Sequence, residues 1–183
     1  MPLLRDSTYM QTHNTFSSFM SVEKTLRNVV DLMLKNPRLL KLLYYNDKHA
    51  LGLPPVNQEQ AYSLLNSSIR IVPKLPIEPD KKSYVFIGLN NFIPEPGQTT
   101  FRSMELSFDI FCDYDLWLLD DFKLRPYAIA GEIDGMINKS FLQNGIADFV
   151  SAANIVLNNH LGGLTLYYNL ETQYDDYEKQ RMK

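Results

Sequence analysis

The most suggestive chemical pattern in the sequence is an acidic cluster made of Asp109, Asp113, Asp115, Asp120 and Asp121. Carboxylate oxygens are the ligands that a hard cation such as Mg²⁺ prefers. Asp109 and Asp113 fall on one side of an extended strand, because successive side chains alternate between its faces. With Lys123 nearby, this pattern is compatible with a Mg²⁺-dependent nuclease. We favour the opposing interpretation, in which the carboxylates are the solvated face of an edge-exposed strand, where charge prevents unwanted pairing.

The other chemistry-bearing residues predict no catalytic centre. His13, His49 and His160 are the three histidines, and none has a second ligand one helical turn away. The single cysteine, Cys112, alternates with apolar residues, so we expect inert packing and no disulfide. No glycine-rich phosphate loop and no Gly-x-Ser-x-Gly elbow is found. We therefore expect a protein that is not an enzyme and that binds no cofactor and no metal.

Composition narrows the class of protein. A chain of 183 residues with 45% hydrophobic and 21% charged residues is typical of a single globular domain. The formal net charge of -3 argues against electrostatic binding of nucleic acid over the whole chain. No apolar run approaches the roughly 20 residues of a membrane-spanning helix, and the N-terminus lacks the apolar core of a signal peptide. We expect a protein of the cytoplasm with no membrane partner.

Helices are predicted in the first half of the chain, after an N-terminal arm of residues 1–20. Ser21 begins a helix whose apolar residues recur every three or four positions. Pro37 ends that helix or opens a second one, and Asn57 caps a third. The helical part covers residues 21–66.

A strand half follows the helices. A short strand is expected at residues 69–72, and a proline-rich connection at residues 73–81 leads to a sheet part at residues 82–172. Residues 84–89 are apolar enough to be a strand covered on both faces, and residues 90–97 are expected to form a loop.

The clearest pattern is the alternation of apolar and polar side chains from Arg102 to Tyr114. Phe111 is its single exception, and the pattern predicts a half-buried antiparallel strand that forms a long hairpin with residues 84–89. Tyr114 is expected on the apolar side.

The last elements are a helix opened by Pro126 and a second hairpin. The hairpin strands are expected at residues 149–157 and 164–170, joined by a turn at residues 158–163. A charged tail of residues 173–183 ends the chain. The predicted fold class is α+β: N-terminal helices, then an antiparallel sheet of two β-hairpins in the order strand, strand, helix, strand, strand, with the helix packed on the sheet. Residues 21–172 form one domain.

Three segments of this pattern resemble the tail terminator (tail completion) proteins of long-tailed bacteriophages. They are the alternating strand at residues 104–111, the helix segment at residues 124–138 and the closing hairpin at residues 161–166, within a match over about residues 60–172. The resemblance implies a homo-oligomeric ring, hexameric in the family, that caps the tail tube and joins it to the head connector. Its implied partners are further copies of itself, the tail tube protein and the head connector or stopper, with DNA only passing through the lumen.

The resemblance also implies a virion protein of the phage neck, assembled in the host cytoplasm. Related α+β designs occur in other head–tail connector, stopper and tail proteins, which therefore stay as alternatives beside the nuclease. A third alternative is a small adaptor that binds a peptide by strand addition.

Aromatic residues provide the candidate interface, since the chain has 11 Tyr and 10 Phe. Phe86, Phe108, Tyr114 and Tyr168 fall on inward strand positions and need only core packing. A surplus set does not, and we expect it to contact a neighbouring subunit or the tail tube. The alternative for Phe92 is that it folds back onto its own core. The candidate interface residues are Asn91, Phe92, Ile93, Phe101, Phe111 and Tyr167.

Overall fold

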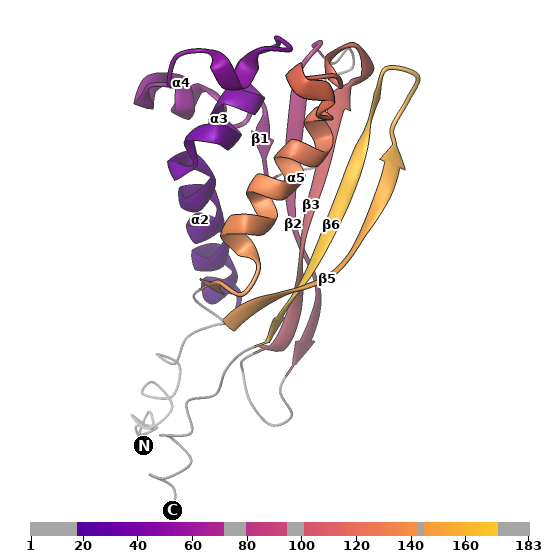
Figure 1. Ribbon diagram of the computed structural model, residues 1–183. Helices are drawn as coiled ribbons and strands as arrows, with labels where there is room; N and C mark the ends of the chain where they lie inside the picture. Colours follow the sequence, from indigo (N-terminus) through magenta and orange to yellow (C-terminus); the bar gives the residue numbers. More distant parts are fainter. Residues whose placement is uncertain (1–17, 72–79, 95–100, 143–144, 172–183) are drawn as a thin grey trace, which may run out of the picture.

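The computed structural model describes residues 18–71, 80–94, 101–142 and 145–171, which fold into a sheet with helices against one of its faces (Figure 1). The helices are α2 (Ser18–Lys35), α3 (Pro37–Tyr44), α4 (Gln58–Ser63) and α5 (Arg125–Ile137), with short 3-10 turns η2 (Ala50–Gly52), η3 (Tyr114–Leu116) and η4 (Asp120–Phe122). The strands are β1 (Ile69–Arg70), β2 (Ser83–Pro94), β3 (Phe101–Asp113), β4 (Phe141–Leu142), β5 (Gly145–Val156) and β6 (Leu161–Glu171).

The six strands form one sheet in the order β1-β2-β3-β6-β5-β4. Two antiparallel hairpins, β2–β3 and β5–β6, join through antiparallel pairing of β3 with β6. The short β1 pairs in parallel with β2 at one edge. This arrangement confirms the predicted α+β class, with the helices first and α5 between the two hairpins.

The main core lies between the helices and one face of the sheet. The even-numbered side chains of β3 supply its centre, because alternation places all of them on the same face: Met104, Leu106, Phe108, Ile110 and Cys112 are 0–2% exposed. Ile129, Ile133 and Ile137 of α5 are fully buried against them, each contributing about 1.5–3 kcal/mol of burial free energy. Tyr168 of β6 completes this layer: its hydroxyl donates a hydrogen bond to Asp134 of α5 over 2.9 Å.

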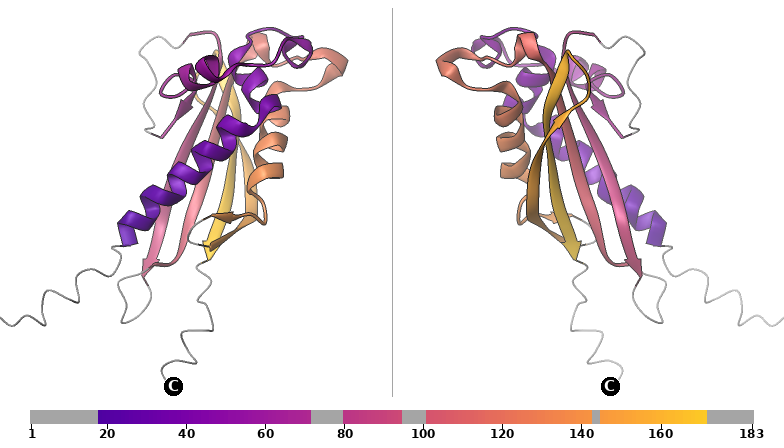
Figure 2. Two further views of the ribbon diagram at one scale, coloured as in Figure 1. Left: turned by 90° about the vertical axis from the view of Figure 1, so that its left-hand side faces the viewer. Right: turned by 90° about the vertical axis from the view of Figure 1, so that its right-hand side faces the viewer.

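The opposite face of the sheet has no described helix over it, as the two views of Figure 2 show. We call it the open face. It carries the odd-numbered residues of β3 and β6, among them Asp109 opposite Thr165. A small second cluster of Tyr84, Phe86 and Leu161, with Phe111 packed on it, is nevertheless buried there. The prediction that residues 84–89 are covered on both faces is therefore confirmed for Tyr84, Val85, Phe86 and Ile87.

Several predicted boundaries are wrong, the largest error being the loop at residues 90–97. Strand β2 continues to Pro94, because Asn91 adopts a left-handed conformation (φ 50°) that shifts the register by a bulge instead of ending the strand. Residues 95–97 lie outside the described part of the chain. Helix α2 begins at Ser18 rather than Ser21, so the predicted arm of residues 1–20 is too long.

Two further corrections concern strand ends. Tyr114 leaves the alternation and begins η3, with its side chain 39% exposed. The second turn is shorter than predicted, because Gly162 and Gly163 belong to β6 rather than to the turn. Most of the proline-rich connection and the whole C-terminal tail fall outside the described residues.

Arg125, the first residue of α5, is a fully buried cation. Its guanidinium donates hydrogen bonds to four backbone carbonyls: Leu116 (2.9 Å), Leu42 (2.7 Å), Tyr45 (2.9 Å) and Asp47 (2.5 Å). Burial lowers the pKa of Arg125 from its ordinary value. These carbonyls include the C-terminal end of α3, where the helix dipole favours a cation. The side chain thus joins the helical half to the segment that follows β3.

Substitution Arg125→Lys is expected to reduce the free energy of unfolding by about 3 kcal/mol, because one ammonium on a flexible stem cannot reach all four carbonyls. Denaturant unfolding measures the loss. The control is Arg27→Lys on the exposed face of α2, where the pair with Glu23 should be worth less than about 0.5 kcal/mol. Equal stabilities for the two variants would contradict the role of Arg125.

Gly163→Ala should be severely destabilising, since a Cβ at this position would lie 1.9 Å from the carbonyl oxygen of Ile110. Backbone on a central strand cannot move aside cheaply, so we expect a loss of about 3 kcal/mol. For a chain of this size the melting temperature should fall by roughly 6–12 °C.

The matched control is Gly131→Ala in α5, where nothing lies within 4 Å of the added Cβ. This change should stabilise the helix by about 0.5–1 kcal/mol. If the Gly163→Ala and Gly131→Ala variants had the same melting temperature, β3 and β6 would not approach each other as closely as described.

Candidate interaction surfaces

The acidic cluster is dispersed by the fold. Asp109 lies on the open face and accepts a hydrogen bond from the Thr165 hydroxyl (2.7 Å). Asp113, four residues further along β3, accepts one from the backbone N–H of Asp115 (3.0 Å). Four residues of strand separate two positions by about 13 Å, too far for one cation with ligands at about 2.3–2.6 Å. Within the described residues, no group of three or more His, Cys, Asp or Glu side chains is placed to hold a metal ion.

Contacts with Lys81 and His49 hold two other aspartates of the cluster at the surface. Asp115 pairs with Lys81 over 2.7 Å, and this hydrogen bond lowers the pKa of Asp115 and raises that of Lys81. Asp120 lies 2.5 Å from Nδ1 of His49. Strand β3 has β2 on one side and β6 on the other. The interpretation of these carboxylates as protection for an edge strand is therefore wrong, because β3 is not at an edge.

Cys112 is buried among core residues, and burial raises the pKa of its thiol to about 12. At neutral pH the side chain is therefore a protonated thiol with little nucleophilic character. His160 lies exposed in the turn between β5 and β6. His13 falls outside the described residues.

Asn91, Phe92 and Ile93 lie together near the end of β2. Asn91 is exposed and its amide donates to Glu105 (3.3 Å), while Ile93 is 52% exposed. Phe92 is half-buried against the main core, and its ring meets that of Phe19 edge-on at 5.7 Å. The alternative that Phe92 folds back onto its own core matches this placement.

The other predicted interface residues are spread along β3 and β6. Phe101 begins β3, opposite Pro94. Phe111 is half-buried on the open face, edge-on to Phe86 at 5.7 Å. Tyr167 is half-buried on the same face, opposite Ser107. The fold therefore does not gather the six predicted residues into one patch.

An apolar loop between β3 and α5 is the exposed feature that the sequence patterns missed. Phe122, at the C-terminal end of η4, is 92% exposed and left-handed (φ 57°), a conformation that phenylalanine rarely adopts. An isolated bridge pairs Leu118 with Leu124, and the Leu119 N–H donates to the Lys123 carbonyl (2.8 Å), so the loop is tightly closed. A strained backbone that displays a large apolar side chain is typical of functional loops. Leu116 and Leu119 of the same segment are buried, whereas Leu118 is 56% exposed.

A second exposed apolar surface is β5. All six residues from Phe149 to Asn154 are exposed, and Val156 is 75% exposed. From Phe149 to Leu157 the sequence contains no charged residue. The turn that follows β5 lies at the same end of the molecule as η3 and the start of α5 (Figure 1).

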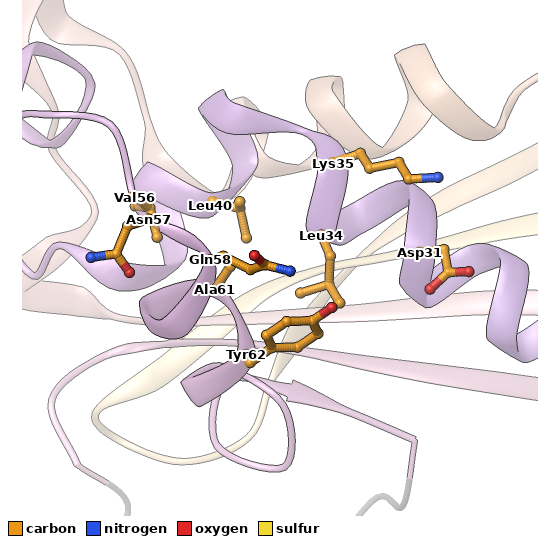
Figure 3. Close-up of a pocket in the computed structure, with 9 residues that line it drawn as sticks. All are labelled: Asp31, Leu34, Lys35, Leu40, Val56, Asn57, Gln58, Ala61 and Tyr62. Carbon is orange, nitrogen blue, oxygen red and sulfur yellow. The ribbon is translucent and has the colours of Figure 1, made fainter.

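A groove of about 350 Å³ lies between α2, α3 and the segment leading into α4 (Figure 3). Figure 3 shows the Tyr62 ring extending toward Leu34 across it. Leu40, Val56 and Ala61 supply further apolar lining, and Asp31 and Lys35 are its only charged side chains. Since no nucleophile and base converge here, the groove has the character of a packing groove between helices.

These observations define an α+β protein whose described residues include exposed apolar side chains on a strand and on a loop. The profile of the YomW family matches residues 36–170, and the chain belongs to this phage-associated family. No curated protein and no solved structure matches the chain. Among the described helices, none has the length and apolar character needed to cross a membrane.

Phe122→Asn is expected to leave the free energy of unfolding unchanged or to raise it by up to about 1 kcal/mol. Asparagine tolerates the left-handed region at lower cost, and Phe122 buries almost no surface in the isolated chain. Guanidinium unfolding measures the effect. For comparison, Phe108→Ala in the core should cost about 3–5 kcal/mol. A loss above about 2 kcal/mol for Phe122→Asn would mean that this ring packs within its own chain.

Proposed function

We propose that this protein is a structural virion protein of the phage neck, a tail terminator whose subunits form a ring that caps the tail tube and joins it to the head connector. The observation that carries the proposal is the exposure of apolar side chains at two places, the Phe122 loop and β5, in a member of a phage-associated family. A monomeric protein seldom exposes such apolar side chains to water, so we expect partner proteins to bury them.

The Phe122 loop has the features of an anchor for another protein. A single aromatic side chain on a short, closed loop loses little conformational entropy on binding, and aromatic anchors supply much of the energy at protein interfaces. We assign this end of the subunit to contact with the tail tube or the head connector.

The open face suits the wall of a channel through which DNA passes. It carries Glu105, Asp109 and Glu171 beside the buried cluster of Tyr84, Phe86 and Leu161, and Ser107 and Thr165 between them are polar and buried. Carboxylates repel the phosphate backbone, so DNA would slide along this wall without being held. In this arrangement the helices form the outside of the ring.

A phage that lacks the gene should produce DNA-filled heads and separate tails of uneven length, visible by electron microscopy. Supplying the wild-type protein should restore joined particles, whereas Phe122→Asn should restore far fewer despite normal folding. Phe122→Tyr, which keeps an aromatic ring on the loop, is the matched control.

Other outcomes favour the alternatives. Tails of defined length beside unjoined heads would point to a head connector or stopper instead. Metal-dependent DNA cleavage by the purified protein that is lost in Asp109→Asn would favour the nuclease. Normal virions in the absence of the gene would refute the proposal.

A further inference from the structure

The sheet has an unpaired stretch at each of its two edges. Strand β1 covers β2 only at Val85 and Phe86, and β4 covers β5 only at Gly145 and Ile146. Among the described strands, none pairs with the outer side of β2 beyond Phe86 or of β5 beyond Phe149. Such stretches present rows of backbone donors and acceptors, which template pairing with another strand.

Backbone hydrogen bonds show which residues of β2 and β5 direct their N–H and C=O groups away from the sheet, at its outer edges. The Val85 N–H donates to Ser68 on the outer side (2.7 Å), so Ile87 and Leu89, two and four residues further, also face outward. On β5 the Leu157 N–H donates inward to Leu161 (2.9 Å), so Ala152, Asn154 and Val156 face outward.

The free stretch of β2 forms one wall of an apolar groove of about 400 Å³. Five consecutive β2 residues, 86 to 90, line it together with Val22 and Leu26 of α2 and with Ser107 and Asp109 of β3. The groove is therefore a strand edge with aliphatic side chains of α2 on one side and polar side chains of β3 on the other, which is the form of a β-augmentation site.

The free stretch of β5 has the matching character. It is extended, uncharged, and exposed on both faces and along its edge. Its bulge falls between Phe149 and Ser151, before the free residues begin. Charges and prolines, which natural edge strands use against pairing, are missing from residues 149–157.

We propose that β5 of one copy pairs with the free edge of β2 in a second copy, so that the sheets join head to tail. Strand β2 runs opposite to β3, β3 opposite to β6, and β6 opposite to β5. Copies repeated in the same sense therefore place β5 antiparallel to the neighbouring β2. Because two different edges meet, the contact is heterologous and generates a ring when the rotation closes.

The strands of such a ring are offset between copies. Val85 lies level with Ile110, Leu164 and Asn154 across the sheet, so the free part of β5 is level with the part of β2 that β1 covers. Pairing with residues 87–90 requires a shift along the strands. Closed sheets absorb this kind of shift by tilting their strands relative to the axis.

Cysteine pairs test the contact, an inference that rests on the proposed ring. Asn90 and the odd-numbered residues Ser151, Ala153 and Ile155 would share the open face, whereas Ala152 and Asn154 point to the helix side. Asn90→Cys combined with Ala153→Cys, Ser151→Cys or Ile155→Cys should give a ladder of oxidised oligomers in the full-length protein. Cys112 will not interfere, because it is buried and its thiol pKa is about 12.

The matched control pairs Asn90→Cys with Ala152→Cys, one residue along the same strand and on the other face. At least tenfold less cross-linking is expected for this pair. Equal cross-linking of both pairs would overturn the head-to-tail contact. Cross-linked dimers of the single variant Ala153→Cys would overturn it too, because they would show that β5 pairs with β5 of another copy.

A proline provides an independent readout. Ala152→Pro removes one outward-facing N–H while the β5–β6 ladder is kept, and edge strands tolerate proline. Light scattering should show this variant as a monomer with unchanged circular dichroism, with Ala152→Ser as the control that still assembles. Suppose that the Ala152→Pro variant still forms a ring and that the cysteine pairs give no oxidised oligomers. This result would refute the β5–β2 contact but not the proposed ring. Oxidised oligomers from a protein that does not restore head–tail joining would refute the proposed function but not the contact.

Discussion

The burial of a single guanidinium holds the two halves of the chain together. Arg125 lies at the start of α5, and its hydrogen bonds reach the end of α3, the segment after it and η3. A buried cation without these acceptors would cost several kcal/mol, so the four hydrogen bonds link the packing of the three segments to this side chain. Because α5 also lies on the sheet through Ile129 and Ile133, the same contact positions the helical layer over the strands.

Local patterns predicted the helices and the four long strands, but not their ends and not the short β4. The even-numbered residues of β3 specify a half-buried strand on their own, because alternate side chains point to the same face and a shift of one residue would expose all of them. Proline at position 37 likewise begins α3, where Asn36 accepts hydrogen bonds from the backbone N–H groups of Arg38 and Leu39. The extension of β2 to Pro94 was missed, since a bulge at a left-handed asparagine resembles a turn in sequence.

The candidate surfaces were predicted less well, for a physical reason. An apolar residue looks the same in sequence whether it enters the core or remains exposed, and only the tertiary arrangement decides. Phe108 and Phe122 differ in this way: the first is fully buried and the second is 92% exposed. The free edges of β2 and β5 depend on the order of strands across the sheet, which no local pattern contains. The carboxylates of β3 misled for the same reason, because the strand proved to be interior.

For the proposed ring, the uncharged stretch of β5 has a consequence that concerns the free subunit. A strand of this kind pairs with any compatible edge that it meets, and the rate of such encounters rises with the square of the subunit concentration. Closed rings end growth, whereas open head-to-tail chains continue it into filaments. In the proposed assembly, the rotation between successive copies therefore decides between a finite particle and a fibre.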